Sequence, residues 1–411
     1  MTPVVLADHA FRHEYGRLVA GLVRRLGPGR LDLAEDAVQT ALLRAVQTWP
    51  RRGVPDDPAA WLRRAARNAA VDVLRREATA HDRRADVALQ VEVAPEADDD
   101  SPLADESLRF LFTCCHPALA AESRVALALK VVCGFGVGEI ARALLSTDAA
   151  VLKRLTRAKD ALAAAGLTAD PVPPDELAER KPAVLAVLYL VFNEGYHSSN
   201  SDALIRHDLC AEAVRQTDAV ARHPDLGGPA AEALLALMLF HAARFPARQD
   251  DHGRLVLLDQ QDRSRWNQAL FRYARAWLTR SARGAELSTY HLEAAIAAEH
   301  CAATTFAATD WRRIVELYDL LCGRDPDWLH ALNRAVAVAH LHGPLAGLRG
   351  LLAARCDGAE RYSHWHAALG ELHRRCGDHT AARRHFAQAL ELAGNERERE
   401  FLRENLVSVA G

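Results

Sequence analysis

Apolar residues recur along most of the chain at spacings of three and four, the period of an amphipathic α-helix. In one clear example, Val151, Leu155, Ala158 and Leu162 follow one another at spacings of four, three and four. Alternating runs rich in Val, Ile and Thr, which are typical of strands, are absent. Ala, Leu, Arg and Glu dominate instead, and these are strong helix formers. The sequence therefore predicts an all-α protein.

Breaks in this pattern divide the 411 residues into segments, and the length favours two to four domains. From Asp86 to Glu106 there are eight acidic residues and no basic one, which predicts a flexible acidic linker. DPVPPDE at 170–176 predicts a second, proline-rich linker. The expected organisation is a helical domain at 8–77, the acidic linker at 78–105, a helical domain at 106–166, the proline-rich linker at 167–181, a helical extension at 182–300 and a repeat-like region at 301–411.

The first domain, 8–77, contains three helical stretches. In the second of them Asp32 is expected to cap the helix, with Glu35 as its capping-box partner. The residues expected to face inward there are Leu33, Ala37, Leu42 and Val46. PRRGVPDDP follows with three prolines and is expected to break the helix, and the next helix starts after Asp57-Pro58.

That next helix is strongly basic. From Arg63 to Arg76 there are five arginines and one acid. Arginine at this density favours binding of phosphate groups. A basic helix can equally present no more than a solvated face, so the composition alone leaves both interpretations open.

The segment GVGEIARALLSTDAAVLKRLTRAKDALAAAG has the spacing of a helix-turn-helix. Ala141 and Val151 stand ten residues apart, as the small inner residue of a first helix and the apolar inner residue of a recognition helix do. Ile140 and Leu144 are expected to pack inward. The side chains expected on the outer surface, where they could reach phosphates and base edges, are Lys153, Arg154 and Arg157. Leu145 departs from the glycine that many such turns contain, and a solvated basic face is the alternative.

Near the C-terminus, Gly343 and Gly377 are 34 residues apart, the tetratricopeptide period. The second unit has the large, small and aromatic residues of such a repeat at Leu369, Gly370, Ala382, Phe386 and Ala389. The first unit, with Leu332, Ala335 and Leu348, fits loosely. An ordinary helical hairpin is the alternative.

Charge and composition exclude several classes of protein. The formal net charge is −3, from 51 basic and 54 acidic residues, so nucleic-acid binding must rest on local clusters. The first residues lack the pattern of a signal peptide, and no apolar run approaches 18 residues, which predicts no membrane span. The eight scattered cysteines are expected to be reduced thiols in the cytoplasm.

Several polar groupings could suggest chemistry, but each has a plainer interpretation. Cys114, Cys115 and His116 contain no CxxC pair, so we expect no metal. His364, His366 and His373 are expected to pack or to face solvent. Asn193, Glu194, Tyr196 and His197 of FNEGYHSSN could form a polar site, although a helix cap at Gly195 is favoured. No glycine-rich phosphate loop and no triad spacing occur, which predicts a protein that is no enzyme and needs no cofactor.

The order of these blocks resembles a known family. LDLAEDAVQTALLRAVQTWP followed by PAAWLRRAARNAAVDVLRRE is similar to conserved region 2 of RNA polymerase sigma factors of the extracytoplasmic-function type. Residues 122–163 resemble their region 4. FTCCHPALA, VLAVLYLVFNEGYHSSN, LVLLDQQDRSRWN, TDWRRIVELYDLL and ELAGNEREREFL resemble the subgroup that carries a long helical C-terminal extension with a tetratricopeptide-like end.

The resemblance implies partners and roles. Core RNA polymerase would bind the face with Asp32, Glu35, Asp36 and Gln39, although Thr40 stands where many relatives have an acid. The residues implied in melting and binding the minus-ten element are Trp61, Arg63, Arg64, Arg67, Asn68, Asp72, Arg75 and Arg76. The helix from about Thr147 to Leu162, with Lys153, Arg154 and Arg157, would read the minus-35 element of promoter DNA.

The extension is expected to add regulation, through contact with the two promoter-binding regions or with a partner protein. Helical repeats usually present a surface for a protein segment. Removing the chain from about residue 177 onward is expected to leave a folded protein with altered promoter output. The alternative function is a helical enzyme or scaffold with FNEGYHSSN as its site and a coincidental helix-turn-helix.

Overall fold

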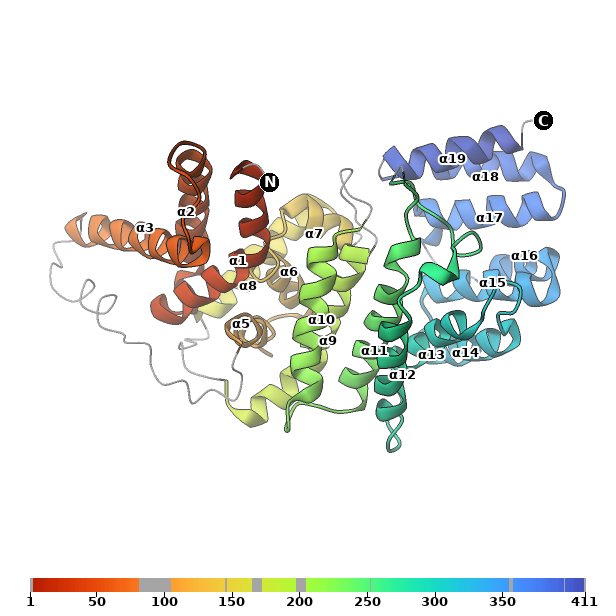
Figure 1. Cartoon of the computed structure of the whole chain (residues 1–411), viewed down its shortest axis with the longest axis horizontal. Coiled ribbons are helices and arrows are strands. Elements are labelled where there is room, and N and C mark those ends of the chain that lie inside the picture. Colours follow the sequence, from red (N-terminus) through yellow and green to blue (C-terminus); the bar gives the residue numbers. More distant parts are fainter. Residues whose placement is uncertain are drawn as a thin grey trace. The chain divides into compact units, whose positions relative to one another are not determined.

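The computed structural model describes residues 3–80, 105–144, 146–164, 172–196, 205–251, 253–354, 358–394 and 396–409. The regular elements in these ranges are helices (Figure 1). Their one β contact is an isolated bridge between Gln249 and Leu255. The prediction of an all-α protein is confirmed. Apart from its two ends, the predicted acidic linker lies outside the described residues.

The helices form two compact units. Unit 1 comprises residues 1–191 and 211–216, and unit 2 comprises 192–210 and 217–411. The helices of unit 1 are α1 (Pro3–Leu26), α2 (Leu31–Arg52), α3 (Pro58–Ala80), α5 (Glu106–Cys114), α6 (Ala121–Val131), α7 (Val137–Ala143), α8 (Asp148–Ala164) and most of α9 (Pro174–Tyr196). The three helical stretches predicted for 8–77 correspond to α1, α2 and α3.

The predicted break at PRRGVPDDP is wrong in its position. Helix α2 continues through Pro50 to Arg52. Proline removes one hydrogen-bond donor, and an exposed Pro50 this close to the helix end costs little regular structure. The helix ends instead at Gly53, whose φ of 84° is in the left-handed region that favours glycine, and whose N–H donates to the carbonyl of Trp49 at 3.0 Å.

Helix α9 begins inside the stretch 167–181 that was predicted to be a linker. Proline is well tolerated in the first turn of a helix, and Pro174 is the first residue of α9. Leu177, Leu185 and Leu188 on this helix are buried. The buried Arg180 donates to the carbonyl of Phe112 at 3.2 Å. The first part of α9 is therefore core structure of unit 1.

Unit 2 is built from consecutive helices joined by short turns. They are α10 (His207–Arg222), of which 211–216 lie in unit 1, α11 (Pro229–Ala243), α12 (Gln268–Ser281), α13 (Thr289–Ala302), α14 (Trp311–Arg324), α15 (Trp328–His342), α16 (Pro344–Ala353), α17 (Ser363–Arg375), α18 (His379–Leu392) and α19 (Glu396–Ser408). Gly343 and Gly377, the two glycines 34 residues apart, have φ values of 91° and 82° and lie between helices. Two successive turns thus fall at the predicted period.

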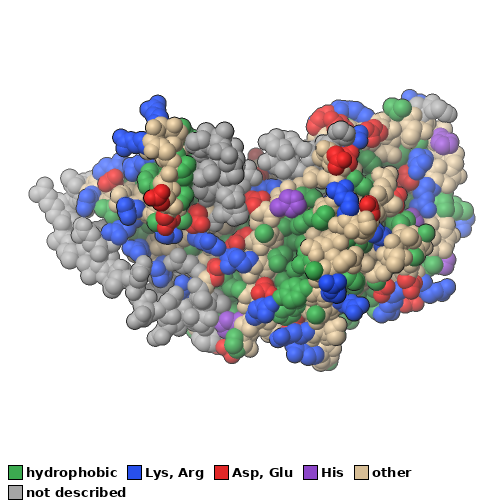
Figure 2. Space-filling view, in the orientation of Figure 1, with side chains coloured by type: hydrophobic (Ala, Val, Ile, Leu, Met, Phe, Trp, Pro, Cys, Tyr) green, Lys and Arg blue, Asp and Glu red, His purple; other side chains and the backbone are tan. Residues whose placement is uncertain are grey.

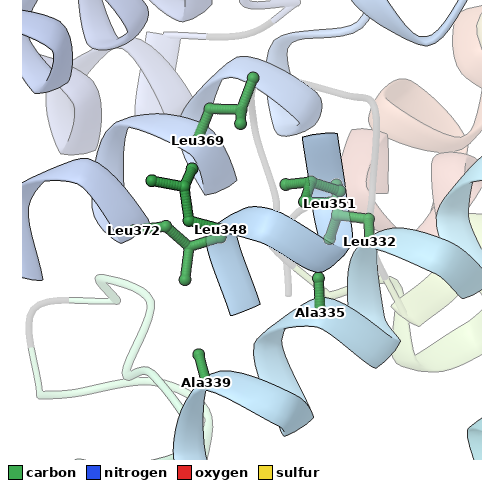
Figure 3. Packing of buried hydrophobic residues seen from close by; sticks show 7 residues of the cluster. All are labelled: Leu332, Ala335, Ala339, Leu348, Leu351, Leu369 and Leu372. Carbon is green, nitrogen blue, oxygen red and sulfur yellow. The ribbon is translucent and has the colours of Figure 1, made fainter. Parts of the chain in front are cut away.

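The two predicted repeat units are helical hairpins with small residues at their contacts. Leu332, Ala335 and Ala339 of α15 pack with Leu348 and Leu351 of α16, and with two leucines of α17 (Figure 3). In the next hairpin, Ala382, Phe386 and Ala389 of α18 are buried. The residues chosen from the repeat pattern do form the hairpin cores, while the tetratricopeptide assignment stays a prediction.

We expect Gly370→Ala to destabilise the second hairpin. A Cβ at Gly370 would lie 2.7 Å from Cδ1 of Phe386, and overpacking of this kind costs about 1–3 kcal/mol. Gly350→Ala is the matched control, because Gly350 is also helical and its Cβ would meet nothing within 4 Å. Thermal unfolding should give a lower Tm for Gly370→Ala and an unchanged or higher Tm for Gly350→Ala. Equal Tm values for both variants would contradict this packing.

Candidate nucleic-acid interface

Helix α3 places its basic residues on one exposed face. Leu62, Ala66, Ala70 and Leu74 recur at spacings of four and are buried, so the residues between them face outward. The exposed side chains are Arg63, Arg64, Arg67, Asn68, Asp72, Arg75 and Arg76. Trp61 is half-buried and packs edge-on against Trp49, with ring centroids 5.6 Å apart. The residues implied in minus-ten binding therefore share one face, with Trp61 fixed at its edge.

Helix α2 presents an exposed stripe beside its buried face. Asp32, Asp36 and Gln39 are exposed, at spacings of four and three. The stripe continues with Leu43 and Val46, which are 62% and 43% exposed. The prediction that Val46 faces inward is wrong, because Ala34, Val38, Ala41, Ala45 and Trp49 fill that role. Sequence analysis missed Leu43, although it falls between those buried positions.

The predicted capping box of Asp32 and Glu35 is also wrong. Helix α2 starts one residue earlier, at Leu31, and its N-cap residue Arg30 makes no side-chain cap hydrogen bond. Asp32 lies in the first turn, where a negative charge is favourable. Glu35 is buried and accepts a hydrogen bond from the hydroxyl of Tyr15 at 3.2 Å. Burial and the nearby Glu35 raise the pKa of Tyr15.

The two carboxylates at the start of α2 share a cation from α8. Nζ of Lys159 donates to Oε2 of Glu35 at 2.6 Å and also binds Asp32. Burial lowers the pKa of Lys159, but the hydrogen bonds to Asp32 and Glu35 outweigh it and leave the pKa above its usual value. Glu35 is thus part of a buried polar contact within unit 1, whereas Asp36 and Gln39 remain exposed.

Helices α7 and α8 pack through the residues that the spacing indicated. Ile140, Ala141 and Val151 are buried. The N-terminus of α7 is closed by Glu139, whose carboxylate accepts from the N–H of Gly136 at 2.8 Å. Leu144 is half-buried, and Leu145 lies outside the described residues.

The three basic residues of α8 differ in their surroundings. Lys153 and Arg157 are exposed. Arg154 is half-buried, binds Glu122 at 2.7 Å and donates to the hydroxyl of Ser146 at 3.3 Å. The expectation that all three lie on the outer surface holds for Lys153 and Arg157 and fails for Arg154.

In unit 2 the FNEGYHSSN segment is core structure at its described residues. Glycine at 195 does not end α9, which continues to Tyr196, so the predicted cap is wrong. A Cβ at Gly195 would lie 2.7 Å from Sγ of Cys210, so glycine permits close approach of α10. Tyr196 is buried, with the guanidinium of Arg248 3.6 Å from its ring centroid. His197 lies outside the described residues.

Cys114 and Cys115 are both buried. Burial raises the pKa of the Cys115 thiol to about 12, which keeps it protonated at neutral pH. His366 is buried and contacts His385, with the two Nδ1 atoms 3.3 Å apart. Across the part of the chain that the structure describes, no group of three or more His, Cys, Asp or Glu side chains could hold a metal ion.

Comparison with known proteins identifies the class of the first domain. Residues 11–79 match sigma-70 region 2, and residues 180–282 match a family of unknown function (DUF6596). Region 2 is the part of a sigma factor that binds core RNA polymerase, so this match supports a sigma-factor-like role in transcription initiation, with core polymerase as a partner.

The chain as a whole has a relative of nearly the same extent. It is 39% identical over 396 residues to an uncharacterized protein of Rhizobium meliloti (strain 1021), and the alignment covers 92% of this chain and 90% of that protein. The chain belongs to the same family as that protein. No solved structure matches it.

One helical stretch, Pro229–Ala247, is long and apolar enough to cross a membrane by composition. Within the structure 67% of this window is buried. Burial of this extent is what the central helix of a folded domain shows, because such a helix is apolar on all sides.

Proposed function

We propose that this protein is a sigma factor that binds core RNA polymerase, directs it to specific promoters and carries no catalysis of its own. One observation carries the proposal: five arginines share the exposed face of α3 within a sigma-70 region 2 domain. Arginine at such density neutralises DNA phosphates, which contribute much of the affinity of DNA-binding proteins. Asn68 and Asp72 on the same face, with Trp61 at its edge, supply groups that can contact unpaired bases.

The exposed face of α2 is the proposed polymerase-binding surface. Asp32, Asp36 and Gln39 offer a carboxylate-rich stripe, and Leu43 and Val46 extend it with apolar surface. Apolar side chains exposed in a line next to charged ones are typical of a protein interface. Glu35, which resembles a docking residue by its position, instead serves the interior of the unit.

Helix α8 is the proposed reader of the minus-35 element. Arrangement of Ala141 and Val151 in the contact between α7 and α8 supports a helix-turn-helix, with the exposed side of α8 toward the major groove. Lys153 and Arg157 are the residues placed to reach DNA. Arg154 is proposed to orient α8 through Glu122 and Ser146.

The extension, residues 182–411, is proposed to regulate this activity by binding a protein segment. Its helical hairpins supply the kind of surface that repeat proteins use for that purpose. Its test is transcription from a cognate promoter by the full chain and by a chain shortened within unit 2, at equal core-polymerase binding. Equal output across conditions would leave the extension without a regulatory role.

The decisive experiment for the main proposal is retention of purified core RNA polymerase by the full tagged chain, followed by transcription from genomic promoter fragments. A sigma factor retains core polymerase and starts transcription at defined positions. A helical enzyme or scaffold built around FNEGYHSSN would do neither. The absence of retention would therefore overturn the proposal.

Replacement of Arg157 by Ala is expected to weaken promoter binding by about 1–3 kcal/mol if its contact is to a base, with a change in stability of about 0.5 kcal/mol or less. Replacement of Arg154 by Ala should weaken binding and also lower the Tm, since it leaves Glu122 without its partner. Promoter affinity of the holoenzyme and thermal unfolding separate the two effects. If Arg157→Ala binds and transcribes as the parent does, α8 is not the reader.

A further inference from the structure

The extension contains a second arginine-dense segment, which sequence analysis passed over. From Arg263 to Arg283 there are six arginines and no acidic residue. The density matches that of α3, where five arginines stand against one acid. Most of this segment is helix α12, within the family of unknown function (DUF6596).

Helix α12 buries one narrow side and exposes the rest. Its buried residues are Ala274, Trp277 and Ser281. Arg272 and Arg275 are exposed, and neither guanidinium forms a hydrogen bond or ion pair with any residue that the structure describes. In Figure 2, Lys and Arg side chains gather over α12 in the lower part of the view. The outward side of this helix is therefore available to a ligand.

Aromatic contacts hold the arginines at the edges of this face. The ring of Trp277 has the guanidinium of Arg222 at 5.2 Å and that of Arg280 at 5.1 Å. Arg222 also donates to the hydroxyl of Tyr273, which is itself 41% exposed. These contacts limit the freedom of the guanidinium groups, so less entropy is lost when they bind a further partner.

The face keeps an excess of positive charge after its internal ion pairs are counted. Arg280 and Arg283 share one buried carboxylate, that of Glu232, at 2.7 and 2.8 Å. Arg222 pairs with Asp218 at 2.7 Å. Five arginines, at positions 222, 272, 275, 280 and 283, thus stand against two contacting carboxylates, which leaves an excess of three positive charges. Such an excess on one helix favours a polyanion.

We infer that this face of α12, the α12 face, binds the phosphodiester backbone of duplex DNA without reading its bases. A helix of 14 residues is about 21 Å long, and duplex DNA carries one charge per about 1.7 Å, so several phosphates lie within reach. Guanidinium groups bind phosphate oxygens in a bidentate manner. In choosing DNA among polyanions the inference rests on the proposed function, since a promoter-binding protein has duplex DNA beside it.

The test is binding of the full chain to a fluorescent duplex of random sequence, as a function of salt. The double variant Arg272→Glu with Arg275→Glu should bind about tenfold more weakly, and its slope of log affinity against log salt should fall by about two. The matched control is Arg349→Glu with Arg383→Glu, which makes the same charge change at exposed helical positions elsewhere in unit 2. The control should stay within about twofold of the parent.

Three further readouts keep the inference falsifiable. Arg272→Lys with Arg275→Lys should retain most of the affinity, and all variants should show the parent's Tm. Equal losses for the α12 pair and the control pair would reduce the effect to net charge and overturn the inference. Loss of core-polymerase retention with unchanged duplex binding would overturn it in favour of a protein partner. If the parent fails to retain core polymerase but the α12 pair still lowers duplex affinity, the α12 face stands and the sigma-factor proposal falls.

Discussion

A chain that ends at residue 176 is expected to lose the cooperative folding of unit 1. The cut removes Leu177, Val184, Leu185, Leu188 and Val191, all of which are buried on α9. Burying a side chain of this type contributes about 1.5–3 kcal/mol. Five of them together match the whole stability of a typical domain, about 5–15 kcal/mol.

Two polar contacts are lost with the same cut. Arg180 donates to the carbonyl of Phe112, at the end of α5. Arg215 binds Asp105, the N-cap residue of α5, which also accepts from the N–H of Leu108 at 2.9 Å. Both ends of α5 therefore depend on residues beyond 176. The expectation from the sequence, that a cut near 177 spares both promoter-binding regions, is at odds with this arrangement.

Amide hydrogen exchange measures this effect helix by helix. The fragment 1–176 should lose protection in α5 to α8, whereas a chain that ends at Leu392, and so lacks only α19, should keep it. Full protection of α5 to α8 in the 1–176 fragment would show that α9 is not required. A cut inside unit 2 is accordingly the better way to ask what the extension does to transcription.

Local periodicity predicted most of the helices because it depends on neighbours in the sequence. Val151, Leu155, Ala158 and Leu162 are all buried, as their spacing indicated. The hairpin contact of Gly370 with Phe386 was also predictable, since a repeat pattern encodes both partners. The basic face of α3 followed from composition and from the spacing of its buried residues.

The errors concern partners that are distant in the sequence. Gly195 was interpreted as a helix cap, but it is set by Cys210 on the next helix. Glu35 was expected on a docking surface, yet it is buried against Tyr15 and Lys159, and the latter is 124 residues away. Val46 was assigned to the core because one apolar stripe was chosen over another of equal periodicity. Nothing in a single sequence ranks such alternatives before the neighbouring helices are placed.

The contact between α2 and α8 leads to a prediction about polymerase binding. Lys159 covers Asp32 and Glu35, beside the exposed Asp36 and Gln39 of the proposed docking face. Helix α1 is also held close to the end of α6, because a Cβ at Gly16 would lie 2.2 Å from the carbonyl oxygen of Val132. Docking of α2 on the polymerase would therefore compete with this packing inside unit 1.

Charge reversal on the two sides of this contact should have opposite effects. Asp36→Arg is expected to weaken core-polymerase binding by about 2 kcal/mol or more, because it places a cation where the face presents a carboxylate. Lys159→Glu is expected to strengthen binding about fivefold, since releasing a partly exposed ion pair makes available about 1 kcal/mol. Lys153→Glu is the matched control for Lys159→Glu, because it makes the same charge change on an exposed position of α8.

Affinity for core polymerase without DNA is the measurement that separates these outcomes. Gly16→Ala should act in the same direction as Lys159→Glu, because it disturbs the packing of α1 against Val132 without touching Asp32, Asp36 or Gln39. Thermal unfolding of each variant shows whether it remains folded. If Asp36→Arg binds as the parent does, α2 is not the docking helix. If it binds weakly while Lys159→Glu and Gly16→Ala match Lys153→Glu, the contact with α8 does not restrict docking, and α2 is accessible to polymerase in the free protein.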